Sequence, residues 1–189
     1  GTTTYSGHDR ASRTDCSGGV CTYAQEIQNF ANWYTYYRSR ILTARAGIGK
    51  AFVDQSDKLR VGFGSINQAS TTIDGVSAKA IKIGVRSFDS ANRVTFFNTL
   101  YQSKIPAQGT PLRQALDAVG KYFSRTDSQG PWSSTPGTVG GTDYTCRQSY
   151  TILMTDGYWN GAQADTSGAT NNNDGTGGTA ITEPAHPPV

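Results

Sequence analysis

The chain has little of several residue types that carry charge or chemistry. Among its 189 residues are two histidines, three cysteines and one methionine, and only 16% of the residues are charged. No apolar run approaches the roughly 18 residues of a membrane-spanning helix. The formal net charge of +3 is too small to favour a nucleic acid as partner. The composition therefore predicts neither a membrane span nor a nucleic-acid-binding protein.

The motifs of common enzymes are also absent. The sequence contains no GxSxG, no HExxH and no P-loop, which are the arrangements that supply a nucleophile, a metal centre or a phosphate cradle. His8 and His186 lie in polar termini, away from other metal-ligating residues. We therefore expect no enzyme activity.

What the chain does have is glycine and small polar residues. It contains 22 glycines, and its length is sufficient for one domain with a core. Such a mixture is typical of secreted and surface proteins with long polar loops. No signal-peptide pattern begins at Gly1, so we expect a mature or trimmed fragment.

The three cysteines leave the disulfide pairing open. Cys16 and Cys21 flank a glycine-containing loop, CSGGVC, and Cys146 precedes an apolar run. In an oxidising compartment three single pairings are available. One is a local Cys16–Cys21 loop with Cys146 buried. In the others, Cys146 ties the loop that holds Cys16 and Cys21 to the predicted sheet.

Residues from Thr22 to about Asp54 have the pattern of one long amphipathic helix. Thr22 and Gln25 form a capping box, in which each side chain satisfies a backbone amide of the first turn. Apolar residues then recur at steps of three and four or their multiples, which places them on one face. We expect this face in the core: Ile27, Phe30, Tyr34, Tyr37, Ile41, Ile48 and Phe52.

Strands and further helices follow. Residues 59–66 and 81–85 alternate between apolar and other residues, as strands do, and an Asp74-Gly75 turn between them indicates an edge hairpin. The two glycines of the first strand predict close approach of another backbone. Helices are expected over residues 90–102 and from Thr110 to residue 123, with Thr110 as the N-cap and Pro111 at the first helical position.

The stretch 150-YTILMTDGYWNG-161 carries the main functional signal. We expect a strand over residues 149–155, apolar throughout at its centre like a parallel strand covered on both faces. Strands that alternate with amphipathic helices predict an α/β three-layer sandwich. Ligands of such sheets bind beyond the carboxyl ends of the strands, which is where Asp156 falls.

Asp156 and Thr110 are candidate ligands for a hard divalent cation, which prefers carboxylate, hydroxyl and water oxygens. For Thr110 alone the simpler explanation is an ordinary helix cap, and for Asp156 a strand-end turn with Gly157. Their joint placement at one edge of the predicted sheet favours the cation. Tyr158 and Trp159 follow the strand and are candidates to line the same site.

Three segments resemble a known family: 29-NFANWYTYYRSR-40, 109-GTPLRQAL-116 and 152-ILMTDGYWNG-161. Together they resemble the N-terminal von Willebrand factor A-like domain of the PilC/PilY family of type IV pilus-associated adhesins. The similarity spans roughly residues 22–161. It implies a Rossmann-like sandwich. Residues 1–21 are polar and without an apolar pattern, so we expect a loop before the first helix, and the low-complexity residues 162–189 are expected to be a polar tail or loop.

The resemblance also implies a metal-ion-dependent adhesion site. In such domains a DxSxS loop, a threonine that opens a helix and an aspartate in a TDG sequence hold the cation; here the last two fall on Thr110 and Asp156. The DxSxS segment is missing, since 15-DCSGG-19 lacks the final serine. We therefore expect a domain that is incomplete at both ends, with Mg²⁺ or Ca²⁺ as its ion.

The resulting hypothesis is a non-enzymatic adhesion and assembly module at a bacterial pilus tip or outer-membrane surface. The resemblance implies roles in pilus biogenesis, twitching motility and attachment. The implied partners are minor pilins, a host or surface receptor, and the rest of the same adhesin. The alternative is a metal-free structural or mechanical spacer that binds minor pilins.

Overall fold

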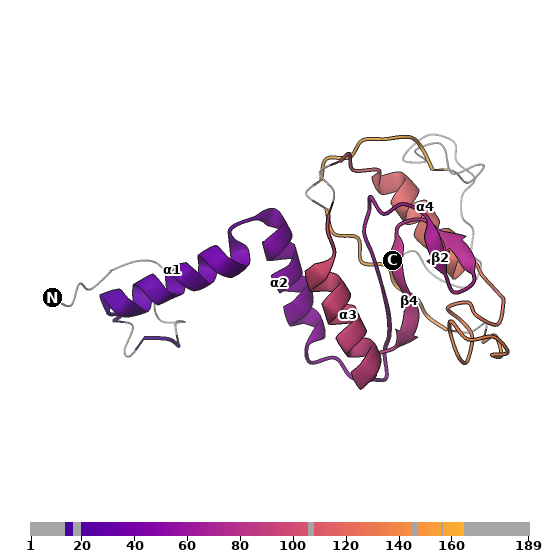
Figure 1. The fold of residues 1–189 in the computed structure, drawn as a ribbon, viewed down its shortest axis with the longest axis horizontal. Coiled ribbons are helices and arrows are strands. Elements are labelled where there is room, and N and C mark those ends of the chain that lie inside the picture. Colours follow the sequence, from indigo (N-terminus) through magenta and orange to yellow (C-terminus); the bar gives the residue numbers. More distant parts are fainter. Residues whose placement is uncertain (1–13, 17–19, 106–107, 145–146, 156, 165–189) are drawn as a thin grey trace, which may run out of the picture. The chain divides into compact units, whose positions relative to one another are not determined.

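A computed structural model describes residues 14–16, 20–105, 108–144, 147–155 and 157–164. Within these residues the chain has four helices and two small antiparallel sheets (Figure 1). The chain divides into two compact units. The first unit comprises the described residues up to Leu59 and those from Phe88 to Ser103, and the second unit comprises the other described residues.

The first unit begins with helix α1, Tyr23–Tyr37, and confirms the predicted capping box. The hydroxyl of Thr22 accepts a hydrogen bond from the Gln25 amide at 3.3 Å. In return the Gln25 side-chain oxygen accepts from the Thr22 amide at 2.8 Å. Two amides without partners in the helix ladder are thereby satisfied.

The prediction of one long helix up to about Asp54 is wrong, because the helix breaks at Arg38–Ser39. Helix α2, Arg40–Phe52, starts anew behind Ser39, whose backbone is extended and whose hydroxyl accepts from the Leu42 amide at 3.3 Å. A serine at this position competes with the backbone and favours a cap over a helix interior. The spacing of apolar residues continues across the break, so this pattern did not indicate that the helix ends there.

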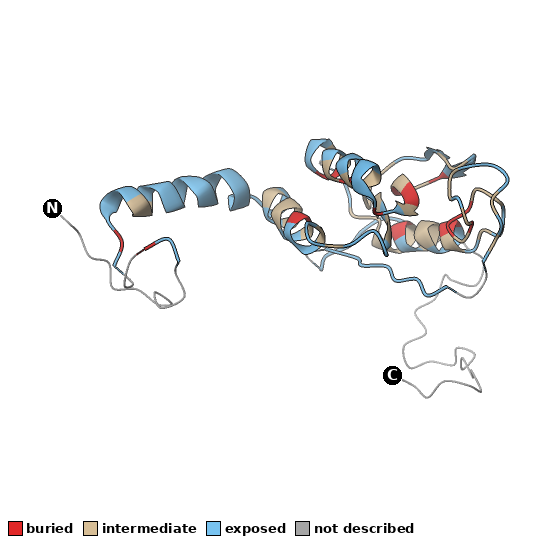
Figure 2. Cartoon of the chain, turned by 90° about the horizontal axis from the view of Figure 1, so that it is seen from below, coloured by how far each residue is buried: buried red, intermediate tan, exposed pale blue. Residues whose placement is uncertain are grey.

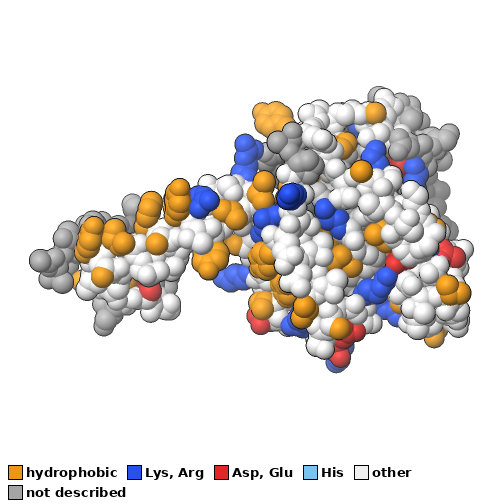
Figure 3. Space-filling view, viewed as in Figure 1, with side chains coloured by type: hydrophobic (Ala, Val, Ile, Leu, Met, Phe, Trp, Pro, Cys, Tyr) orange, Lys and Arg blue, Asp and Glu red, His pale blue; other side chains and the backbone are white. Residues whose placement is uncertain are grey.

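The prediction that the apolar stripe lies in the core is also wrong for α1. None of the residues of α1 is buried, and Phe30 at the centre of the stripe is 59% exposed. Figure 2 colours α1 as almost entirely exposed, and Figure 3 shows hydrophobic side chains on the surface along this helix. A periodic pattern specifies an apolar face but does not say which segment covers it, and no described residue does so here.

Helices α2 and α3 (Ser90–Gln102) form the packed part of the first unit. The α3 bounds agree with the predicted helix. The ring of Phe96 lies 5.2 Å from that of Phe52 and 5.4 Å from that of Phe88, which is almost fully buried. Gly49 leaves room for the Tyr101 hydroxyl, which a Cβ at that position would overlap. An aromatic cluster thus holds this unit together.

The second unit contains strands β1 (Arg60–Gly64) and β4 (Ile81–Ser87), which pair antiparallel. Both strands were predicted. A Cβ on Gly64 would lie 2.4 Å from the Ala80 carbonyl oxygen, and one on Gly62 would lie 3.1 Å from the Ile83 carbonyl oxygen. The predicted close approach of another backbone is confirmed.

A hairpin and a helix complete the core of the second unit. Strands β2 (Thr71–Ile73) and β3 (Val76–Ala78) are joined by Asp74 and Gly75, both with positive φ, as a two-residue hairpin turn requires. Helix α4 spans Leu112–Phe123. The buried cluster comprises one residue of β3, two of β4 and one of α4: Ala78, Ile81, Val85 and Tyr122.

The predicted buried strand over residues 149–155 is not a strand in the structure. Residues 147–155 pair with no other described segment, and Tyr150 and Ile152 are 80% and 79% exposed. A strand needs a neighbour for its backbone groups, and no described strand lies beside this run. The chain is thus mixed helix and strand, consistent with an α/β class, but its described part forms only antiparallel pairs and not the complete three-layer sandwich.

Candidate functional site

The two segments that carry the predicted cation ligands meet at the start of α4. The Thr110 amide donates to the Asn160 side-chain oxygen at 2.6 Å, and the Asn160 amide donates to the Thr110 carbonyl at 3.0 Å. Gly109 permits this contact, because a Cβ there would lie 2.3 Å from the same Asn160 oxygen. Residues 157–161 are therefore fastened to residues 109–111.

An aromatic contact strengthens this junction. The Arg113 guanidinium lies 4.0 Å from the centre of the Trp159 ring, a cation–π distance. Tyr158 beside it is 89% exposed. Trp159, which was expected to line the cation site, thus lies against the first turn of α4. Arg113 is 46 positions before Trp159, and nothing in the sequence around Arg113 indicated this contact.

Thr110 is not the N-cap of α4, so that prediction is wrong by one residue. The first helical hydrogen bond runs from the Ala115 amide to the Pro111 carbonyl at 3.0 Å, which makes Pro111 the N-cap. Pro111 has no hydroxyl, and α4 starts without a side-chain cap. The backbone of Thr110 is instead engaged with Asn160.

The second predicted ligand, Asp156, lies outside the described residues, so the cation site stays a prediction. Of its two neighbours in sequence, Gly157 donates its amide to the Thr155 hydroxyl at 3.3 Å. Among the described residues no group of three or more His, Cys, Asp or Glu side chains could hold a metal ion. Of the two predicted ligands they include Thr110 alone, whereas Mg²⁺ and Ca²⁺ take six or more oxygens.

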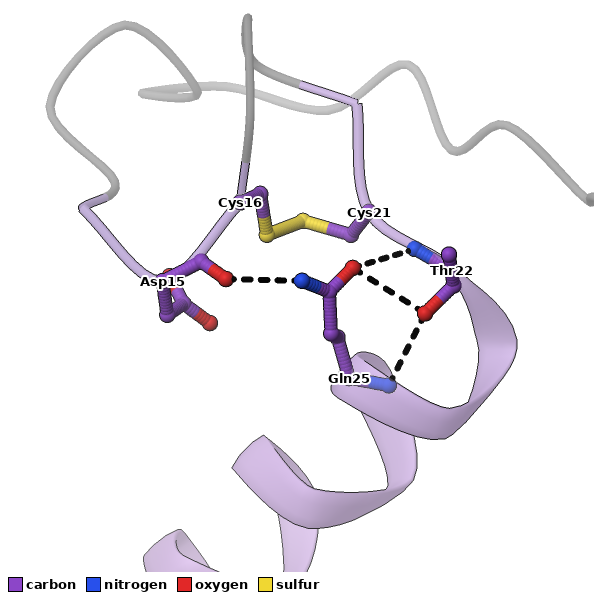
Figure 4. Close-up of a disulfide and its surroundings, with 5 residues drawn as sticks. All are labelled: Asp15, Cys16, Cys21, Thr22 and Gln25. Atoms are coloured by element: carbon purple, nitrogen blue, oxygen red, sulfur yellow. Dashed lines mark hydrogen bonds between the residues drawn. A yellow bond between two sulfur atoms is a disulfide. The ribbon is translucent and has the colours of Figure 1, made fainter.

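The disulfide in the structure is the local one. Cys16 and Cys21 are bonded, with their Cα atoms 5.0 Å apart (Figure 4). Gln25 of the capping box also donates to the Asp15 carbonyl at 2.9 Å, so the closed loop is attached to the first turn of α1. Cys146 lies outside the described residues.

A buried polar network was missed by the sequence analysis. The Asp74 carboxylate accepts from the Tyr122 hydroxyl at 2.7 Å and forms an ion pair with Arg86. The Tyr122 hydroxyl accepts from the Val85 amide at 2.9 Å. Burial and then the bond to Asp74 raise the pKa of Tyr122 well above its ordinary value. An Asp-Gly turn was visible in the sequence, but the partners of its carboxylate were not.

The long loop between α4 and residue 144 is ordered. The Arg60 guanidinium donates to the carbonyls of Ser133 at 2.7 Å and Ser134 at 3.2 Å, and Ser133 is fully buried. The indole N–H of Trp132 donates to the Phe123 carbonyl at the end of α4. This stretch is rich in glycine, serine and threonine, but nothing in the sequence indicates these contacts.

Comparison with known proteins identifies relatives. The chain is 38% identical over 146 residues to a type IV pilus biogenesis factor PilY1 of Pseudomonas aeruginosa (strain PAK). It is 35% identical over 170 residues to the PilY1 of strain PAO1. These matches cover 77% and 87% of the chain.

The chain is homologous to one part of PilY1. This homology supports the predicted relation to PilY proteins. The assignment of a von Willebrand A-like domain remains a prediction. The chain spans only 12% and 15% of the length of these two PilY1 proteins. No family model matches the chain, and no solved structure matches it. In the part of the chain that the structure describes, no helix is both long and apolar enough to cross a membrane.

Proposed function

We propose that the chain is a non-enzymatic module of a PilY-type protein, located at the cell surface, that supports type IV pilus biogenesis, twitching motility and attachment. The observation that carries this proposal is 35–38% identity to PilY1 over most of the chain. PilY1 is named for pilus biogenesis, and no nucleophile–base arrangement was found in the sequence. Partners would be minor pilins, a surface receptor and the rest of the same polypeptide.

In this proposal Thr110 and Asp156 are two ligands of a divalent cation, Mg²⁺ or Ca²⁺, and the partner supplies a further carboxylate. Support comes from the junction at α4. Asn160 is bound to Thr110 through both of its hydrogen bonds, and it lies four residues after Asp156. These two bonds hold the backbone of Thr110 close to the segment that follows Asp156 in sequence.

The second candidate is a metal-free spacer that binds minor pilins through its surface. The exposed apolar face of α1 favours it, because large uncovered apolar patches are common at protein interfaces. On this account Asp156 is an ordinary carboxylate that ends a turn.

Thermal melting in chelator, Mg²⁺, Ca²⁺ and Mn²⁺ separates the two candidates. A cation held at 100 times its dissociation constant should add about 2.7 kcal/mol to the free energy of unfolding. We expect Asp156→Asn and Thr110→Val to abolish the part of the gain that is due to this site, with Asp57→Asn as the control. Equal gains in all four proteins, or no gain in any, would reject the cation and leave the spacer.

A further inference from the structure

The loop of residues 126–144 holds a second set of oxygen atoms, far from the junction at α4 in sequence. The loop is fixed by hydrogen bonds within itself. The Ser134 amide donates to the Thr142 carbonyl at 2.7 Å, and the Thr142 amide donates to the Ser134 hydroxyl at 3.0 Å. Ser133 and Asp143 are opposite each other in an antiparallel bridge. The two arms of the loop therefore lie side by side.

Three oxygen atoms converge beside Gly141. A Cβ at this glycine would lie 1.9 Å from the Ser133 hydroxyl, 2.5 Å from the Thr135 hydroxyl and 3.0 Å from the Ser128 carbonyl. Ser133 is fully buried. Because Gly141 has no side chain, hydroxyl and carbonyl oxygens occupy the space around its Cα.

Asp143 adds a carboxylate on the same side. Residues opposite each other in an antiparallel pair project their side chains to one face, and so do residues two positions apart. Asp143 is opposite Ser133 and two positions after Gly141, so its carboxylate lies on the face of the Ser133 hydroxyl. Its Oδ1 atom is buried and has no hydrogen-bond partner among the described residues. A buried carboxylate oxygen without a partner is unfavourable unless a cation offsets its charge.

We propose that Ser128, Ser133, Thr135 and Asp143 form a calcium site within this loop. The site offers a carbonyl, two hydroxyls and a carboxylate, all hard oxygen ligands, and water completes the shell. Calcium accepts such mixed and irregular sets, whereas Mg²⁺ demands a near-ideal octahedron. With a single carboxylate the expected dissociation constant is about 0.1–1 mM, the range of extracellular modules. The site is independent of Thr110 and Asp156.

Terbium luminescence tests the site directly, since Tb³⁺ replaces Ca²⁺ and is excited through a nearby indole. Trp132 adjoins Ser133, so bound Tb³⁺ should emit on excitation of tryptophan, and Ca²⁺ should displace it. The experiment uses the whole chain with Asp156→Asn, which removes the other proposed carboxylate ligand. Asp143→Asn should then weaken Tb³⁺ binding by about 10–100-fold, a typical effect of disturbing a metal site.

Two further variants make the test decisive. Asp127→Asn is the matched control, because Asp127 is in the same loop but its carboxylate is paired with Arg125; it should bind Tb³⁺ as before. Gly141→Ala should block binding, because the added methyl group would occupy the space between the three oxygen atoms beside residue 141. Amide exchange at Ser134 and Thr142 reports whether each variant keeps the loop folded. Unchanged binding in a folded Asp143→Asn protein, or no Tb³⁺ signal that Ca²⁺ displaces in the parent, would overturn the proposal.

Discussion

Tyr122 and Asp74 show how single residues hold the second unit together. The Tyr122 hydroxyl receives the Val85 amide and donates to the Asp74 carboxylate, so one phenol connects α4, β4 and the hairpin turn. Arg86 pairs with the same carboxylate, and this bond raises the pKa of the guanidinium. A buried group of this kind stabilises a fold only while each member has its partner.

This network predicts a loss of stability in alkali. Because the pKa of Tyr122 is raised in the folded protein, the folded state keeps its proton above pH 10 while the unfolded state loses it. The free energy of unfolding should therefore fall by up to about 1.4 kcal/mol per pH unit from pH 10 upward. Tyr122→Phe should remove this part of the slope in urea unfolding at pH 9 to 11, although the variant is less stable throughout.

Tyr150→Phe serves as the control for that experiment, since Tyr150 is exposed. It should follow the parent protein at every pH. If Tyr122→Phe and the parent lose stability with the same slope, the buried phenol is not the group that titrates.

At the scale of elements, α1 depends on local interactions. It has 15 residues, none of them buried, and helices of this length are marginal without tertiary packing. Its capping box and the disulfide loop attached through Gln25 supply the local support (Figure 4).

Thr22→Ala should therefore reduce the helicity of α1 without moving the melting of the second unit. Loss of a threonine N-cap costs about 1 kcal/mol, which is large for a helix that has no buried residues. Hydrogen exchange of residues 26–37 should quicken, while that of β4 should not change. Thr95→Ala, an exposed threonine inside α3, is the control. Equal protection of α1 in Thr22→Ala would mean that packing rather than the cap maintains the helix.

The elements that could be predicted are those that carry their own signals. Helix α3 has matching bounds because Asp89 caps it and turn-forming residues follow it. Strand β1 was predicted from its own alternation of residues. The Asp74-Gly75 turn was predicted from its residue types, but it joins β2 and β3, which were not predicted, rather than β1 and β4. The run 149–155 failed because strand formation depends on a neighbour, and the break at Ser39 failed because the apolar period crosses it.

The candidate site was predictable to a similar extent. Thr110 and the TDG sequence are visible as motifs, and the structure brings their segments together. The contact of Arg113 with Trp159 and the oxygen cluster around Gly141 depend on tertiary folding, so sequence spacing gives no sign of them.

At the scale of the whole molecule, two apolar surfaces of the described residues are largely exposed. They are the aromatic face of α1 and the apolar run from Tyr150 to Met154. The relatives are far longer than this chain. The proposed role in a larger PilY-type protein gives both surfaces a use, as contacts with other segments or with partners.

The most direct test of that role is a chimera. In Pseudomonas aeruginosa PilY1, the segment that aligns with this chain would be replaced by it, and surface pili would be counted beside cells in which the segment is deleted. The account predicts that the deletion removes most pili and that the chimera restores them. Normal pili in the deletion, or a stably produced chimera with as few pili as the deletion, would contradict it.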